Sequence, residues 1–389
     1  MEGTKFALVL CGKSLVSLMP DLASKSHAAI GSLKHVAAAS LSINRIQRGH
    51  GFVYRQRDQR LVRKPPDLKR IKSLAIPPAW TNVRICARAN GHLQATGRDA
   101  RGRKQYIYHP QWRKFRDRKK FVHMIAFAHA LPSIRKRVRR DLKRKGVPKS
   151  KVLAAVVRLL ERSRIRVGNE TYTKNNGSYG LTTFRDRHVR VQKQKLSFQF
   201  RGKSGKDRSV EFTDAELARV VKRCQEIPGQ ELFQYIDDEG QRQKINSDDV
   251  NNYLRDISGG DFTAKDFRTW SGTLMMSKLL DSLHGFDSKS QAKKQISEAI
   301  KAVAKHLGNT PSICRKCYVH PAVIEAYLSG KIHKPNNGKR RTQKSNRLVA
   351  LRSDEMAVLR LLTRHHGCHR DPRRKGALGK VRKRPSKSK

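Results

Sequence analysis

The chain has 389 residues, of which 37% are hydrophobic, so it is long enough for two domains with cores of their own. Its 86 lysines and arginines against 31 acidic residues give a net charge of +55, which favours a polyanion, above all nucleic acid, as the partner. No stretch approaches the ~20 apolar residues of a membrane-spanning helix, so we expect no membrane partner. The six cysteines are scattered, which favours a reducing cytoplasm over a disulfide framework.

The N-terminal part of the chain predicts a small β-rich domain. Residues 1–50 form no clear pattern, and we interpret them as a poorly specified extension. Residues 51–115 alternate short apolar runs with glycine turns, which predicts an antiparallel sheet with one short helix near residues 66–74. The following run from Arg113 to Lys151 holds sixteen basic residues and two acids, and its apolar residues fit helical faces. Its charge suggests a linking segment that contacts nucleic acid.

The remainder of the chain is predicted to be mostly helical. One apolar stripe from Leu153 to Leu160 ends near Arg164, and a second from Ile296 to Leu307 is followed by Gly308, a residue type common just past helix ends. In the C-terminal part, Ser353 could cap a short helix over 354–364.

Residues 189–212 differ from their helical surroundings. Every second residue from Leu196 to Phe200 is apolar, and Gly202–Gly205 is typical of a turn, so we predict a β-hairpin with Lys203 at its tip. Farther on, Thr310 followed by proline favours the start of a helix that would carry Tyr318 and end or kink near Pro321.

Four segments carry the residue types that a metal-free phosphoryl-transfer site needs. Tyrosine can attack phosphorus and form a covalent intermediate, two arginines can neutralise a phosphodiester, and lysine can protonate the leaving oxygen. The segments are IRVGNE around Arg166, FRGKSGK around Lys203, KDFRTW around Arg268 and RKCYVHP around Tyr318.

In this order the four segments resemble the type IB DNA topoisomerases, in particular their compact poxvirus-like bacterial form. The resemblance runs from about Gly51 to about Pro335. It implies that Tyr318 is the nucleophile and forms a 3′-phosphotyrosyl bond, that Arg166 and Arg268 bind the phosphate, and that Lys203 is the general acid.

Two further positions matter for this resemblance. Asn309 stands nine residues before the tyrosine, where viral and eukaryotic members tend to have histidine, and it is implied to donate an uncharged hydrogen bond to a phosphate oxygen. Lys265 is implied to assist as a second phosphate contact. A tyrosine recombinase, which runs the same chemistry, would show histidine where Lys265 stands, three residues before the second arginine.

The N-terminal domain adds a second similarity. The segment from Gly102 to Tyr108 resembles the DNA-contacting strand of the family's N-terminal domain, and alternation places its two tyrosines on one face. The DNA contacts that the resemblance implies are Lys104, Gln105, Tyr106, Tyr108 and, in the catalytic domain, Tyr172.

We therefore expect an α+β protein in which a β-rich domain and a larger, mainly helical domain with a β-hairpin form a clamp around duplex DNA. The expected boundaries are residues 1–50 for the extension, 51–115 for the β-rich domain, 116–335 for the catalytic domain and 336–389 for a basic, largely disordered tail. The expected function is relaxation of positive and negative supercoils by a monomer in the cytoplasm, associated with the nucleoid, without ATP, metal or another cofactor. A tyrosine recombinase and a non-enzymatic nucleoid protein remain the alternatives.

Overall fold

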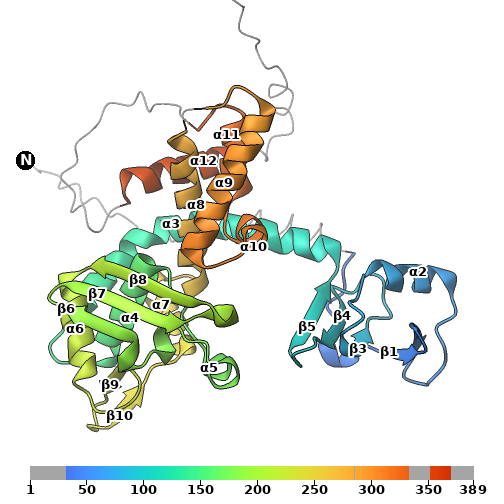
Figure 1. Cartoon of the computed structure of the whole chain (residues 1–389), viewed down its shortest axis with the longest axis horizontal. Helices are drawn as coiled ribbons and strands as arrows, with labels where there is room; N and C mark the ends of the chain where they lie inside the picture. The colour runs from blue at the N-terminus through green and yellow to red at the C-terminus, as the bar shows by residue number, and fades with distance from the viewer. Residues whose placement is uncertain (1–31, 284, 333–350, 369–389) are drawn as a thin grey trace, which may run out of the picture. The chain divides into compact units, whose positions relative to one another are not determined.

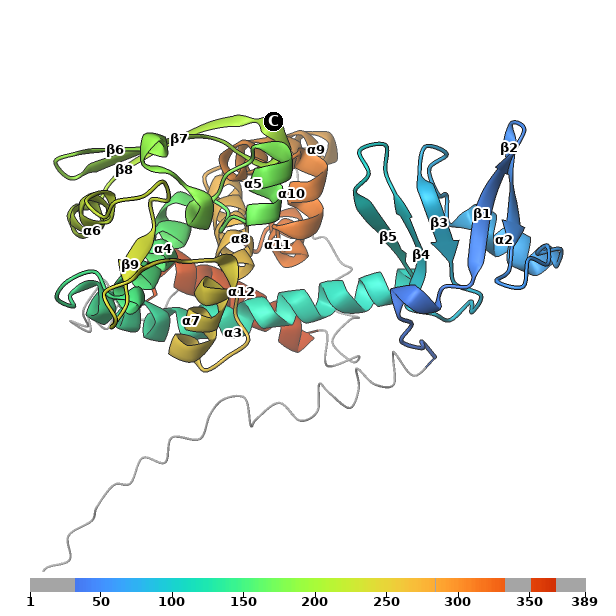
Figure 2. The same cartoon turned by 90° about the horizontal axis from the view of Figure 1, so that it is seen from below.

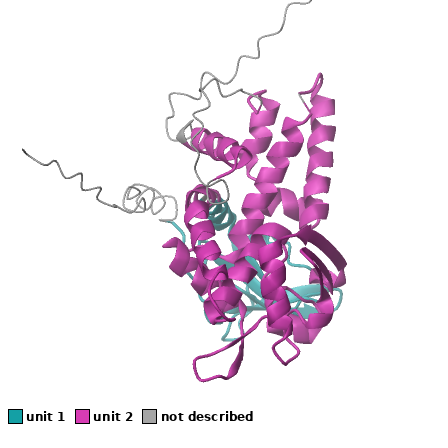
Figure 3. Ribbon diagram, turned by 90° about the vertical axis from the view of Figure 1, so that its left-hand side faces the viewer, with its two compact units in different colours: residues 1–120 teal, residues 121–389 magenta. Residues whose placement is uncertain are grey.

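The computed structural model describes residues 32–283, 285–332 and 351–368. The chain divides into two compact units, one up to Lys120 and one from Phe121 onward, so that the boundary falls inside helix α3 (Pro110–Leu142) (Figure 3). Each unit has its own apolar core. The mixture of an antiparallel sheet in the first unit with mostly helices in the second makes this an α+β fold.

The first unit is a five-stranded antiparallel sheet in the order β2-β1-β3-β4-β5 (Figures 1 and 2). Helix α2 brings Ile71 into a cluster with Ile43, Val83 and Ile85 of the sheet. The bounds are Ala38–Ser40 for a short 3-10 helix, Ile43–Arg48 for β1, Gly51–Arg55 for β2, Pro65–Ser73 for α2, Thr81–Ile85 for β3, Leu93–Arg98 for β4 and Lys104–Tyr108 for β5. The predicted sheet and helix are confirmed.

The sheet begins upstream of residue 51, inside the segment that we interpreted as an extension. Strand β1 pairs with both β2 and β3, and its first residue, Ile43, is buried. Leu41 is also buried, in a small cluster with Leu93. The strand was not predicted because arginine and asparagine separate its two isoleucines, so the alternation of apolar and polar residues is short and weak.

The second unit holds most of the helices, a three-stranded sheet in the order β6-β7-β8, and a short hairpin of β9 and β10 (Figure 1). Its helices are α4 (Lys149–Ser163), α5 (Glu170–Asn176), α6 (Ala215–Gln225), α7 (Ser247–Ser258), α8 (Ala264–Asp281), α9 (Lys289–Leu307), α10 (Pro311–Cys317), α11 (Pro321–Leu328) and α12 (Ser353–Cys368). Its strands are β6 (Val189–Gln192), β7 (Lys195–Arg201), β8 (Asp207–Thr213), β9 (Gln234–Ile236) and β10 (Arg242–Lys244).

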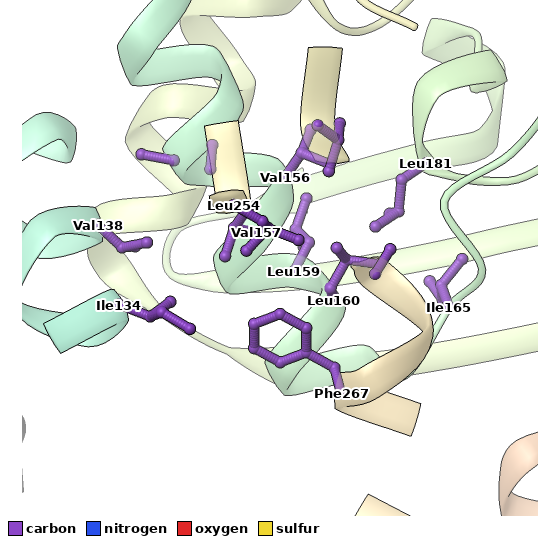
Figure 4. Close-up of a cluster of buried hydrophobic side chains, with 14 of the residues drawn as sticks. Ile134, Val138, Val156, Val157, Leu159, Leu160, Ile165, Leu181, Leu254 and Phe267 are labelled. Atoms are coloured by element: carbon purple, nitrogen blue, oxygen red, sulfur yellow. The ribbon is translucent and has the colours of Figure 1, made fainter. Parts of the chain in front are cut away.

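Helix α4 forms the centre of the larger core. Its apolar stripe is fully buried and meets Ile134 of α3, Leu254 of α7 and Phe267 of α8 (Figure 4). The helix ends at Ser163, and the next residue, Arg164, adopts a left-handed conformation with φ +56°. That turn directs the next two residues, Ile165 and Arg166, away from the helix axis. The buried helix α4 therefore fixes the backbone position of Arg166, the first candidate arginine.

A second core joins α8 to α9, α10 and α11, the elements around Tyr318. Helix α9 ends at Leu307 with Gly308 in the left-handed region, and the Thr310 side chain caps α10, as predicted. The prediction that α10 carries Tyr318 and ends near Pro321 is wrong by a few residues: α10 ends at Cys317, and Pro321 begins α11. Proline is favoured in the first turn of a helix, where its missing N–H is not needed.

The helix predicted after Ser353 is confirmed as α12, and it belongs to the core. Val358 and Leu362 are buried in the larger core of the second unit, and the buried Glu355 carboxylate accepts two hydrogen bonds from Arg135 of α3. Residues 1–31, 336–350 and 369–389, parts of the expected extension and tail, lie outside the described residues. Within the described ranges, no helix is long and apolar enough to cross a membrane.

Candidate active site

Helix α8 fixes the backbone around Tyr318. The Thr273 hydroxyl donates to the Tyr318 carbonyl at 3.2 Å and accepts from the His320 N–H at 3.1 Å. A Cβ atom at Gly272 would lie 2.7 Å from the Tyr318 carbonyl oxygen, closer than real contacts allow, so glycine is what lets the two segments approach. Tyr318 itself is half-buried and follows directly after α10.

Arg268, one turn before Gly272 on α8, brings its guanidinium to the tyrosine. Its side chain is almost fully buried, and the guanidinium carbon lies 5.4 Å from the centre of the Tyr318 ring. It donates to the Leu307 carbonyl at 2.7 Å and to the Arg164 carbonyl. Burial lowers the pKa of Arg268, while the nearby tyrosine opposes that shift.

Arg166 and Asn309 form the other side of this cluster. Arg166 donates to the Asn309 side-chain oxygen at 2.5 Å and to the Gly308 carbonyl at 3.3 Å. Burial, followed by repulsion from Arg268 and Arg208, lowers the pKa of Arg166 to about 10, so it stays protonated at neutral pH. Two arginines thus meet at successive carbonyls of the α9 terminus beside the tyrosine.

Two donors in this cluster are buried without a hydrogen-bond partner among the described residues: Arg268 Nε and Asn309 Nδ2. Leaving such donors unpaired costs about 1–3 kcal/mol each, so their presence in a well-packed site calls for an acceptor from outside the chain. A phosphate oxygen is the acceptor that arginine and an uncharged amide donor both suit.

The structure brings four of the six predicted catalytic residues together and leaves the two lysines outside. Lys203 lies exposed at the turn between β7 and β8, and no hydrogen bond joins its ammonium to the tyrosine or the arginines in the described part of the chain. Lys265 is exposed on the first turn of α8. The predicted hairpin is confirmed, with a third strand, β6, paired to it.

Sequence reasoning missed Arg208, which ties the Lys203 hairpin to the site. From β8 it donates to the Leu307 carbonyl at 3.0 Å and to the His306 carbonyl at 2.9 Å. One arginine among so many cations carries no signal by itself. Gly272 could have been found, because it stands four residues after Arg268 and therefore on the same helix face.

The predicted DNA-contacting strand is β5. The rings of Tyr106 and Tyr108 stack with centroids 6.2 Å apart, which confirms that they share a face, and the Lys104 ammonium lies 5.6 Å from the Tyr106 ring centre. Gln105 donates to the Asp99 carboxylate at 2.9 Å. In the second unit Tyr172 on α5 is 59% exposed. Exposed aromatic rings beside cations suit contact with nucleic acid.

The chain matches two family models. The catalytic core of eukaryotic DNA topoisomerase I matches residues 109–346, and the N-terminal domain of bacterial DNA topoisomerase IB matches residues 51–99. The chain belongs to the type IB DNA topoisomerases. The resemblance inferred from four short segments is thereby confirmed for most of the chain.

Viral members of the family are among its relatives. The DNA topoisomerase 1B of Acanthamoeba polyphaga mimivirus is 32% identical over 292 residues, 73% of this chain and 87% of that protein. The DNA topoisomerase 1B of Vaccinia virus (strain Copenhagen) is 23% identical over 270 residues, 67% of this chain and 82% of that protein. As a type IB enzyme, the chain relaxes supercoiled DNA by transient cleavage of one strand, swivelling and resealing through a phosphotyrosyl bond.

Proposed function

We propose that Tyr318 is the nucleophile of this reaction and that Arg166, Arg268 and Asn309 bind the phosphate under attack. The observation that carries the proposal is the convergence of both arginines on the end of α9 beside the tyrosine, with Arg268 Nε and Asn309 Nδ2 left as buried donors. Charge that develops on the nonbridging oxygens would meet donors already held in place, which needs little reorganisation.

In the proposed cleavage step, Tyr318 Oη forms a bond to phosphorus and the bond from phosphorus to the 5′ oxygen breaks. The phenolic proton passes to water, and the 5′ oxygen takes a proton from Lys203, so that a 3′-phosphotyrosyl bond and a 5′-hydroxyl result. Resealing runs the same step backwards. Because the phosphodiester energy stays in the tyrosyl bond, resealing needs no ATP. The arginines and Lys203 would supply the positive charge and the proton for which other phosphoryl-transfer enzymes use a metal ion.

The proposed DNA contacts involve both units. Lys104, Gln105, Tyr106 and Tyr108 on β5 and Tyr172 on α5 would contact duplex DNA, which a monomer would hold as a clamp. Lysine and arginine supply the phosphate attraction, and Lys265 adds a contact near the scissile phosphate. Inside the cell we place the enzyme in the cytoplasm, on the nucleoid.

Relaxation of negatively supercoiled plasmid in EDTA without ATP tests the nucleophile, with wild type beside Tyr318→Phe. We expect wild type to relax the plasmid and the variant to bind it without relaxing it, because phenylalanine lacks only the hydroxyl. Persistent relaxation by the variant would show that Tyr318 is not the nucleophile. Absence of relaxation by wild type would contradict a mechanism that needs neither ATP nor a metal ion.

The role of Lys203 needs a separate test, because the structure leaves it exposed. We expect Lys203→Ala to slow cleavage of an ordinary duplex strongly, and to recover most of the rate on a duplex whose 5′ bridging oxygen is replaced by sulfur. A thiolate leaves without a proton, so the general acid becomes unnecessary. Equal slowing on both substrates would assign Lys203 to DNA binding instead.

A further inference from the structure

A basic pocket lies beside the catalytic cluster and takes no part in the proposed reaction. It has a volume of about 460 Å³, within the range of small-molecule sites, and lies between the end of α4, strand β8 and the end of α9. Five nitrogen-bearing side chains line it, namely Arg162, Arg164, Arg208, Lys305 and His306. Tyr318, Arg166 and Asn309 are not part of its wall.

Asp214, outside the pocket, brings its carboxylate to 3.9 Å from Arg162 Nε, but the wall itself has almost no negative charge to balance these groups. Its single acidic residue, Glu211, is already bound on the surface, because its carboxylate lies 2.7 Å from the Lys195 ammonium and 2.8 Å from the Ser197 hydroxyl. Burial lowers the pKa of Arg164, and neighbouring Arg352 and Arg162 add to the shift. The cations are therefore held at a cost that a bound anion would offset.

The wall also offers donors that have no acceptor in the described part of the chain. Arg208 donates through both terminal nitrogens, so its Nε–H has no acceptor among the described residues. Arg164 donates through Nε and Nη1, so its Nη2 has none there either. Strand β8 is the outer strand of its sheet. The Thr213 carbonyl accepts a hydrogen bond from Arg162 on the edge of β8 that no described strand covers. Backbone groups two residues apart on a strand face the same edge, so the backbone N–H of Glu211 faces this edge too.

The C-terminal end of α9 would repel an anion in the pocket, since its last carbonyls carry partial negative charge. Arg208 covers the carbonyls of His306 and Leu307 with hydrogen bonds of 2.9 and 3.0 Å, which reduces this repulsion. We propose that the pocket binds a phosphate group other than the one that Tyr318 attacks. Planar guanidinium groups bind phosphate oxygens in pairs, and the surplus of cations in the wall matches the charge of a phosphate.

Such a phosphate could come from the backbone of the bound DNA or from a small phosphate compound. Either source would act close to catalysis, because Arg268 donates to the backbone carbonyl of Arg164 and shares the Leu307 carbonyl with Arg208. The pocket therefore borders the groups that hold the catalytic arginine, without containing it.

The test uses the full-length chain and two charge-matched double variants. Arg162→Gln with Lys305→Gln removes two cations at the pocket wall, neither of which contacts the catalytic cluster. Arg219→Gln with Lys294→Gln removes two exposed cations elsewhere on the same unit, on α6 and α9. Any effect of net charge alone appears in both double variants, so the difference between them belongs to the pocket.

The first arm measures pyrophosphate binding by calorimetry at physiological salt. We expect binding at least about tenfold weaker in the pocket variant than in the control, since loss of a single charged hydrogen bond already lowers affinity by roughly that factor. The second arm measures how the affinity for a short duplex falls with salt, in a Tyr318→Phe background that prevents cleavage. Loss of one phosphate contact should reduce the slope of log affinity against log salt by about 0.9 relative to the control.

Each outcome bears on the proposal. A reduced salt slope, with or without weaker pyrophosphate binding, supports the pocket and identifies DNA as the source of the phosphate. Weaker pyrophosphate binding with an unchanged slope supports the pocket and identifies a small phosphate compound. If the two double variants agree in both arms, the pocket binds no phosphate and the proposal is overturned.

Discussion

Replacement of Thr273 by valine should separate positioning of the tyrosine from DNA binding. The Thr273 side chain is fully buried in α8, and its hydroxyl joins the Tyr318 carbonyl to the His320 N–H. Valine fills nearly the same volume but leaves both backbone groups without their partner. At ~1–3 kcal/mol for each of the two unsatisfied groups, the free energy of unfolding should fall by about 2–6 kcal/mol.

The effect on cleavage follows from the same two bonds. Without them, the segment from Tyr318 to His320 can move relative to Arg268, and a displacement of about 1 Å in a reacting group can cost on the order of 100-fold in rate. We expect Thr273→Val to slow cleavage ~10–100-fold and to leave DNA affinity within about twofold, because phosphate contacts elsewhere supply that affinity.

Thr273→Ser is the matched control, because serine keeps the hydroxyl and loses only a methyl group. It should cost about 1 kcal/mol of stability and change the cleavage rate little. The assay is the rate of covalent complex formation on plasmid DNA with enzyme in excess, beside equilibrium binding and chemical denaturation. A folded valine variant that cleaves at the wild-type rate would refute the view that α8 positions Tyr318.

Three further outcomes are expected. Asn309→Ala should slow cleavage about 100-fold, the scale of one lost oxyanion donor, and Asn309→Asp should slow it more because a carboxylate repels phosphate, as single-turnover rates would show. Gly272→Ala should lower stability by about 1–3 kcal/mol and slow cleavage, since its methyl would meet the Tyr318 carbonyl at 2.7 Å; denaturation and cleavage assays check both. Burial alone would raise the pKa of Glu355, but Arg135 outweighs it and holds that pKa below its ordinary value, so the stability from this pair is present above about pH 4.5 and is lost as pH falls through the folded pKa. The difference in unfolding free energy between wild type and Glu355→Gln should therefore stay constant from pH 7 to about pH 4.5 and shrink at lower pH.

Local signals predicted local structure well. Gly308 after α9, the Thr310 cap of α10 and the turn at Gly202 are all where the sequence placed them, because caps and turns depend on a few adjacent residues. The error at Pro321 has the same local origin. Proline can end one helix or begin the next. The hydroxyl of Thr273 on α8 bonds the backbone at Tyr318 and His320, between the two helices, and this contact between distant residues is not visible in the local sequence.

Contacts between distant residues were beyond the sequence. Arg166 was found only because its neighbours match a family segment, whereas Arg208, equally close to the cluster, has no such neighbours. Strand β1 was missed because its partners, β2 and β3, supply the burial that its own pattern does not reveal. The positions of Lys203 and Lys265 relative to a phosphate stay predictions, since neither side chain is held by another residue in the described chain.

The end of α9 explains how several arginines can crowd one site before any phosphate arrives. Like charges at this spacing repel, and burial increases the repulsion. Arg268 and Arg208 share the Leu307 carbonyl, and Arg166 reaches the Gly308 carbonyl one residue later, so the negative end of the helix offsets part of that repulsion. Backbone carbonyls, which no residue code specifies, thus orient the guanidinium groups in advance. An incoming phosphate then needs to find only the remaining donors, Arg268 Nε and Asn309 Nδ2 among them, rather than to assemble the site.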